Sequence, residues 1–150
     1  MIKIIWVGKI KETSYKEAVD EYLKRLSRYT KIQAMEIADE KGDNQDRVLG
    51  REKDRILSKI KDRDYLVVLD RSGEKFDSIG LADKINSILL NHNVTFVIGS
   101  SHGLHNIIIK RANLKLSFSD LTFPHQLFRV IFLEQLYRAF KIINNETYHK

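Results

Sequence analysis

The sequence predicts an α/β fold, with a mostly parallel β-sheet and helices on both of its faces. Five apolar, β-branched segments alternate with five segments of helical periodicity along the 150 residues. Two of the apolar segments, Tyr65–Leu69 and Val94–Ile98, are continuous runs, which is typical of strands covered on both faces. No repeat, low-complexity tract or linker interrupts this alternation, so we expect one domain over residues 1–150.

The N-terminal half of the chain alternates strand, helix, strand and helix. Ile2–Gly8 is rich in Ile and Val and predicts the first strand. Ser14 followed by Glu17 matches a capping box, which predicts that the first helix begins there. Ile32–Ile37 predicts the second strand. After a polar loop, Asp46–Ile60 predicts the second helix, although a glycine within it is unfavourable.

The C-terminal half continues the same alternation. Tyr65–Leu69 predicts a strand, a loop follows from Arg71, and Ser78 is the expected N-cap of a helix that reaches about Leu90. Pro124 suits the first position of a long final helix. The remaining predicted elements are the strand Val94–Ile98, the short helix His105–Ala112, the strand Leu114–Phe118 and the final helix Pro124–Ile143.

Three loops follow the carboxyl ends of predicted strands, where ligands bind in sheets of this kind. They are Asp70–Ser78, Gly99–Leu104 and Ser119–Thr122, and they form one pocket if their strands are neighbours. The turn Phe118–Phe123 combines two hydroxyls and an aspartate with large apolar residues, unlike an ordinary solvated turn. Such a lining suits an adenosine-like ligand, which has a flat apolar base and a polar edge.

The composition indicates the cellular compartment of the protein and the kinds of partner that it binds. There is no cysteine, no signal peptide and no run near the ~18 apolar residues of a membrane span, so we expect a cytoplasmic protein without a membrane partner. Lys and Arg number 26 against 20 Asp and Glu, a formal net charge of +6. This moderate charge fits an RNA partner, and it equally fits an ordinary soluble surface.

The sequence lacks the motifs of several common classes of binding and catalytic site. The first predicted strand is followed by Gly8-Lys-Ile-Lys-Glu-Thr, which is neither a dinucleotide-binding fingerprint nor a phosphate loop of the Walker type. Gly99–Gly103 is flexible enough for a phosphate nest, although a tight strand-to-helix turn is the commoner use. Without cysteine or a carboxylate cluster we expect no metal site, and no serine has a convincing His and Asp partner.

The final helix is apolar around most of its circumference, which predicts cover on more than one side. We expect a second copy of the chain to supply part of that cover in a two-fold homodimer; the alternative is a helix buried within one subunit. Arg129 falls among apolar neighbours and requires either a structural ion pair or an anionic ligand. Glu134 and Arg138 are spaced for a helical ion pair.

The last residues, Tyr148, His149 and Lys150, combine an aromatic face, a titratable ring and a cation. Such a group could stack on a base and hold a phosphate, although a frayed terminus is the simpler interpretation.

These motifs together resemble the RlmH-type ribosomal RNA methyltransferases of the SPOUT superfamily. The resemblance covers essentially the whole chain, and the order and spacing of the motifs make it specific. The segments that carry it are Val97–Leu104, Leu116–His125, Arg129-Val, Glu134–Ala139 and Tyr148–Lys150. The chain differs from the family pattern at Ser100, where a second glycine is usual, and at Glu74, where a lysine commonly follows the glycine; here Lys75 comes one position later.

The resemblance implies a homodimer with a C-terminal trefoil knot, which periodicity could not predict. It implies methylation of N3 of a pseudouridine in a large-subunit rRNA stem-loop on the ribosome, with S-adenosylmethionine as methyl donor. The alternative function is a non-catalytic RNA-binding module on the same fold. The residues implied for the cofactor are Leu69, Gly99, Phe118, Ser119, Asp120, Leu121, Thr122 and Phe123. The candidate pool for substrate binding and catalysis, with no base assigned, is His125, Arg129, Glu134, Arg138, Tyr148, His149 and Lys150.

Overall fold

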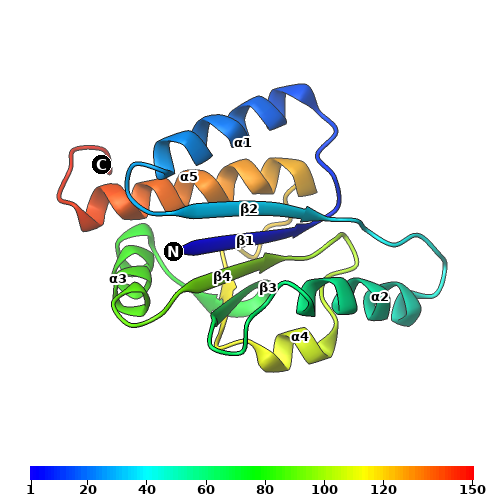
Figure 1. Ribbon diagram of the computed structural model, residues 1–150. Coiled ribbons are helices and arrows are strands. Elements are labelled where there is room, and N and C mark those ends of the chain that lie inside the picture. The colour runs from blue at the N-terminus through cyan, green and yellow to red at the C-terminus, as the bar shows by residue number, and fades with distance from the viewer.

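The computed structural model describes residues 1–150 and contains one five-stranded, wholly parallel sheet in the order β2-β1-β4-β3-β5 (Figure 1). The strands are β1 (Ile2–Val7), β2 (Ile32–Ile37), β3 (Tyr65–Lys75), β4 (Val94–Ile98) and β5 (Leu114–Ser117). The helices are α1 (Thr13–Leu26), α2 (Gln45–Leu57), α3 (Ser78–Leu89), α4 (Asn106–Arg111) and α5 (His125–Ile143). The predicted α/β class and the alternation of five strands with five helices are confirmed.

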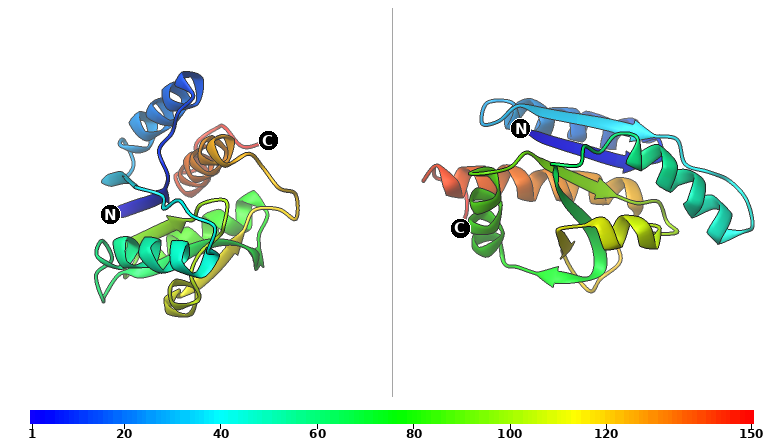
Figure 2. Two further views of the ribbon diagram at one scale, coloured as in Figure 1. Left: turned by 90° about the vertical axis from the view of Figure 1, so that its right-hand side faces the viewer. Right: turned by 60° about the horizontal axis from the view of Figure 1, so that its bottom comes forward.

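Helices cover both faces of the sheet (Figures 1 and 2). Helices α1, α3 and α5 pack on one face around a large core that includes Ile4 and Phe96. Helices α2 and α4 pack on the other face, where Ile56 and Ile108 meet a smaller core that includes Ile5. Successive strand residues therefore face opposite cores, which explains why the strands are continuously apolar.

Both predicted N-caps are wrong, and Pro124 is the N-cap of α5 and not its first residue. Ser14 lies inside α1, which begins at Thr13 after Glu12, and no side chain caps it. Ser78 is the first residue of α3, and the cap is the preceding Asp77, whose carboxylate accepts a hydrogen bond from the Gly80 amide. Where two capping residues are adjacent, the sequence alone does not decide between them.

Strand β3 continues well beyond the predicted loop start at Arg71. It pairs with β5 through Leu69, loops out over four residues, and pairs again through Glu74 and Lys75. Gly73 lies in this bulge, and a Cβ added there would be 2.7 Å from backbone atoms of Lys115. The bulge thus brings two backbones closer than any side chain allows.

Helix α5 lies between α1 and α3 (Figure 2), so one chain already covers much of its apolar circumference. One line along the helix, formed by Leu127, Ile131, Glu134 and Arg138, remains partly exposed. The spacing of these residues places them on a single helical face. No helix of the structure is both long and apolar enough to cross a bilayer.

We predict opposite effects of alanine at two glycines. Gly73→Ala should lower the free energy of unfolding by about 1–3 kcal/mol, because its Cβ would collide with the β5 backbone. Gly50→Ala should raise it by about 0.5–1 kcal/mol, because Gly50 lies within α2 with no atom near its added Cβ. Urea unfolding at one protein concentration measures both, and a Gly73→Ala protein as stable as the wild type would contradict the close approach.

Candidate functional site

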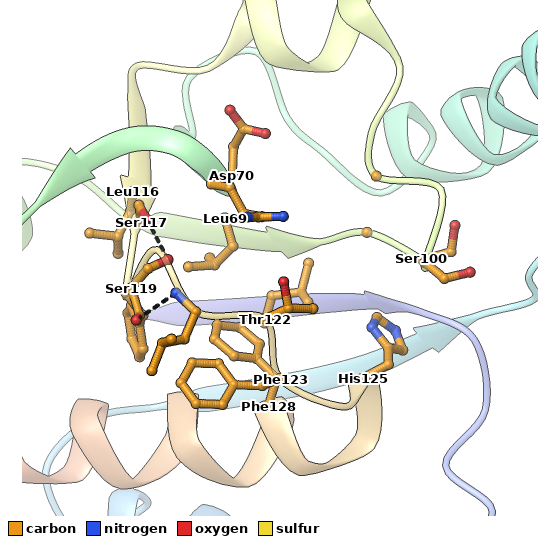
Figure 3. Close-up of a pocket in the computed structure, with 17 residues that line it drawn as sticks. Leu69, Asp70, Ser100, Leu116, Ser117, Ser119, Thr122, Phe123, His125 and Phe128 are labelled. Carbon is orange, nitrogen blue, oxygen red and sulfur yellow. Dashed lines mark hydrogen bonds between the residues drawn. The ribbon is translucent and has the colours of Figure 1, made fainter.

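A cavity of about 290 Å³ opens where the bulge of β3 meets the carboxyl ends of β4 and β5 (Figure 3). Because β3 lies between the other two strands, its bulge after Leu69 and the loops that follow β4 and β5 meet there. Its volume is close to the lower limit, about 300 Å³, of pockets that hold small ligands. Seven of the eight residues implied for the cofactor line it: Leu69, Gly99, Phe118, Ser119, Leu121, Thr122 and Phe123.

The cavity has aromatic walls and a polar rim. The ring of Phe128 lies 5.4 Å from that of Phe118 and 6.1 Å from that of Phe123, measured between centroids. The side chains of Ser100, Ser119 and Thr122 add hydroxyl groups to the lining (Figure 3). Phe128 was not among the residues expected here, although it follows His125 at the spacing of one helical turn.

Asp120 is not among the residues that line this cavity. Its carboxylate is exposed and pairs with Lys75, which lowers the pKa of Asp120 from its ordinary value. Its backbone carbonyl accepts a hydrogen bond from Arg71 at 3.1 Å, and within the turn the Leu121 amide donates to the Ser119 hydroxyl at 2.9 Å. Asp120 therefore fastens the turn to β3.

Glu52 is a buried carboxylate behind the cavity that the sequence did not reveal. It is 2% exposed and accepts hydrogen bonds from the Ser100 hydroxyl at 3.2 Å and from the Glu40 amide at 2.9 Å. The serine that departs from the family pattern is thus tied to α2. The only sequence signal was an acidic residue four positions after Val48 on the apolar side of the helix.

His125 and Arg129 connect the start of α5 to the end of β1. The His125 Nε2 atom donates to the Val7 carbonyl at 3.1 Å, which leaves Nδ1 as the acceptor of the neutral ring. Arg129 is 2% exposed and donates to the Gly8 carbonyl at 2.6 Å and to Glu36 at 2.7 Å. Burial lowers the pKa of Arg129, and Glu36 opposes that shift. Of the two roles that the sequence left open for Arg129, the structural ion pair is the one observed.

Glu134 organises a second polar cluster near the other end of α5. One of its oxygens accepts from Arg138 at 2.6 Å and from the Tyr148 hydroxyl at 3.0 Å, and Arg138 also donates to His149 Nδ1 at 3.1 Å. Burial and Glu134 raise the pKa of Tyr148 to about 12, so its phenol is protonated at neutral pH. The tail is therefore folded back onto the helix.

The candidate catalytic residues thus fall into two groups within one chain. His125 lines the cavity, and Arg129 lies behind it, one turn along α5. The cluster around Arg138 lies thirteen residues farther along α5 than His125, about 20 Å at 1.5 Å per residue. Lys150 is exposed and forms no ion pair.

Comparisons with known proteins identify the family. A family model described as "Predicted SPOUT methyltransferase" matches residues 1–149. A protein of Caldicellulosiruptor saccharolyticus named "Ribosomal RNA large subunit methyltransferase H" is 49% identical over 154 residues, the whole of both chains. A protein of the same name from Ruminiclostridium cellulolyticum is 47% identical over 99% of each chain.

A solved structure has the same fold at low sequence identity. It is "a probable methylase family protein from Haemophilus influenzae Rd KW20", which superposes with a TM-score of 0.56 at 15% identity, over 99% of this chain and 70% of that one.

SPOUT methyltransferases use S-adenosylmethionine as methyl donor, and the cavity suits this group. Its aromatic and aliphatic walls match a purine base, while its hydroxyls and loop backbone offer partners for ribose and purine edge atoms. From residue 1 to residue 149, the chain belongs to the SPOUT methyltransferase family.

Proposed function

We propose that this chain methylates N3 of a pseudouridine in a large-subunit rRNA stem-loop on the ribosome, in the cytoplasm. The observation that carries the proposal is that relatives 47–49% identical over at least 99% of their length are named ribosomal RNA large subunit methyltransferase H. Because these alignments span at least 99% of each chain, they include the residues of the cavity and of the C-terminal tail. The net charge of +6 is consistent with an RNA partner.

The cavity between the bulge of β3 and the carboxyl ends of β4 and β5 is the proposed cofactor site. Leu69, Gly99 and the turn Phe118–Phe123 would hold S-adenosylmethionine, with the turn as the wall that faces the base. When bound, this group supplies a methyl carried on a sulfonium, which makes the methyl strongly electrophilic. The contribution of Asp120 would be indirect, because its carboxylate pairs with Lys75 outside the cavity.

The residues of the chain must position the target nucleotide and accept the proton that leaves its N3 atom. The neutral imide is a poor nucleophile, and a nearby cation both lowers its pKa and stabilises the charge that develops. Arg138 and the tail residues Tyr148, His149 and Lys150 provide cations and an aromatic face for this purpose. His125 offers a free Nδ1 beside the cavity and is the nearest candidate for the proton acceptor.

A homodimer would bring the two groups together. The partly exposed line on α5 is apolar at Leu127 and Ile131 and charged at Glu134 and Arg138. If two copies pack these lines against one another with opposite directions, the His125 end of one helix lies beside the Arg138 end of the other. The 20 Å separation within one chain then becomes contact between chains, and each site is built from both subunits.

The family's trefoil knot is also part of the proposal. The chain leaves α4 on one face of the sheet, forms the edge strand β5, and returns as α5 on the opposite face (Figure 2). On the way, the turn Phe118–Phe123 passes the bulge of β3 and the loop that follows β4. The proposed knot further requires that this segment threads through the loop that those residues form.

One prediction tests the proposed cofactor site. Leu121→Asp should weaken S-adenosylmethionine binding more than tenfold, because a carboxylate in the apolar lining must lose its hydration when the ligand enters. Leu121 is 71% exposed, so folding should be unaffected. Leu90→Asp is the control, since Leu90 is 75% exposed and lies outside the cavity. Calorimetry measures both variants, and unchanged binding by Leu121→Asp would place the donor elsewhere.

A second prediction tests whether each site uses both subunits. Leu121→Asp disables the cavity, and deletion of residues 148–150 disables the tail. A heterodimer of the two variants, purified through two different affinity tags, should regain about half of the wild-type rate on ribosomes, because one of its two sites has an intact cavity and an intact tail. Both parent homodimers should be inactive. A heterodimer as inactive as its parents would show that cavity and tail act within one subunit.

A further inference from the structure

The loop between β1 and α1, residues 8–12, is fastened to the frame of the cavity through its backbone. The Lys11 and Glu12 amides both donate to Gln126 Oε1, at 2.9 and 3.0 Å, and the Ile10 amide donates to Glu36 at 2.7 Å. Gly8 turns the chain with a φ of +101°, and its carbonyl accepts from Arg129. The loop therefore has a fixed conformation although it lies at the surface.

The side chains of this loop alternate between core and solvent. Ile10 packs against the large core, while Lys9 and Lys11 on either side of it are exposed. Neither lysine has a carboxylate within ion-pair distance. The acidic neighbour Glu36 is already paired with Arg129, and Glu12 occupies the N-cap of α1, where the helix dipole offsets its charge. Two cations are thus held outwards without a partner.

These lysines follow the carboxyl end of β1, at the same edge of the sheet as the cavity. Gln126, which holds their backbone, follows His125, and His125 both lines the cavity and bonds to the last residue of β1. Figure 3 shows β1 ending next to His125. A strand of RNA that approaches the cavity from the side of His125 passes close to residues 8–12.

We propose that the loop of residues 8–12 binds RNA phosphates next to the target nucleotide, through Lys9 and Lys11. This inference rests on the proposed rRNA substrate and assigns a surface to it. Lysine binds phosphate as a point charge without reading sequence, so the loop fixes the position of the strand and leaves recognition of the nucleotide to the cavity and the tail. Fixing the backbone in advance reduces the ordering cost of each contact.

The chain contains its own matched control for this proposal. The same Lys-Ile-Lys tripeptide recurs at residues 59–61, again with both lysines exposed and with Ile60 packed against a core. That copy lies between the end of α2 and the start of β3, at the amino edge of the sheet and away from the cavity. The two copies differ mainly in their place in the fold.

The test compares two double variants, Lys9→Ala with Lys11→Ala and Lys59→Ala with Lys61→Ala. The first should bind unmodified ribosomes roughly tenfold more weakly, and the slope of log affinity against log salt should become less negative by about 1 per lysine. Between about 50 and about 200 mM salt the wild type should then lose roughly tenfold more affinity than this variant. The second double variant should match the wild type.

Further measurements separate this inference from the proposed function. The Lys9/Lys11 variant should keep wild-type S-adenosylmethionine affinity by calorimetry and wild-type mass by light scattering. A wild-type slope for that variant would overturn the inference while leaving the function intact, and so would equal losses in both double variants. A dissociated dimer would overturn it by assigning the lysines to the partner subunit. If the wild type itself does not methylate ribosomes, the proposed function fails first.

Discussion

The buried guanidinium of Arg129 is the interaction on which the geometry of the site depends. It joins α5 to the end of β1 through Gly8 and to β2 through Glu36, three elements that are far apart in the sequence. Burying a charge costs several kcal/mol unless partners compensate it, so the guanidinium favours only arrangements in which these acceptors converge. His125 and the loop of residues 8–12 take their positions from the same convergence. A charge that is paired within the protein thereby fixes the edge of the sheet at which the cavity opens.

The other side of the cavity is shaped by close backbone contact. The bulge in β3 lets Gly73 approach β5, and from the same stretch Arg71 and Lys75 both reach Asp120. The turn Phe118–Phe123 is therefore held from its outer surface, while its aromatic rings face inwards and pack on Phe128. Hydrogen bonds and an ion pair on its outer surface, together with aromatic packing on its inner surface, hold this six-residue turn in one conformation although it is not buried.

The sequence predicted the fold class and nearly all elements because strand and helix periodicities are local signals. It also predicted that the segments after Leu69, Ile98 and Phe118 meet, because the carboxyl ends of parallel strands share one edge. What it could not supply were pairings that depend on strand order. Glu36 for Arg129, Glu52 for Ser100 and Lys75 for Asp120 are separated by 93, 48 and 45 residues. The length of β3 was missed for the same reason, since its last residues are a strand only by pairing with β5.

Strand order also decides what the charges of this chain can do. Near the cavity, Arg129 and Lys75 are already paired with carboxylates, and Arg71 donates to a backbone carbonyl. These cations hold the protein together and have little capacity left for a polyanion. The Lys-Ile-Lys tripeptides at residues 9–11 and 59–61 have the same composition and the same pattern of exposure. In the fold, however, the first lies at the carboxyl edge of the sheet and the second at the amino edge. A net charge of +6 is therefore too coarse to locate an RNA surface, and the proposed phosphate contacts are assigned to lysines that have no carboxylate partner.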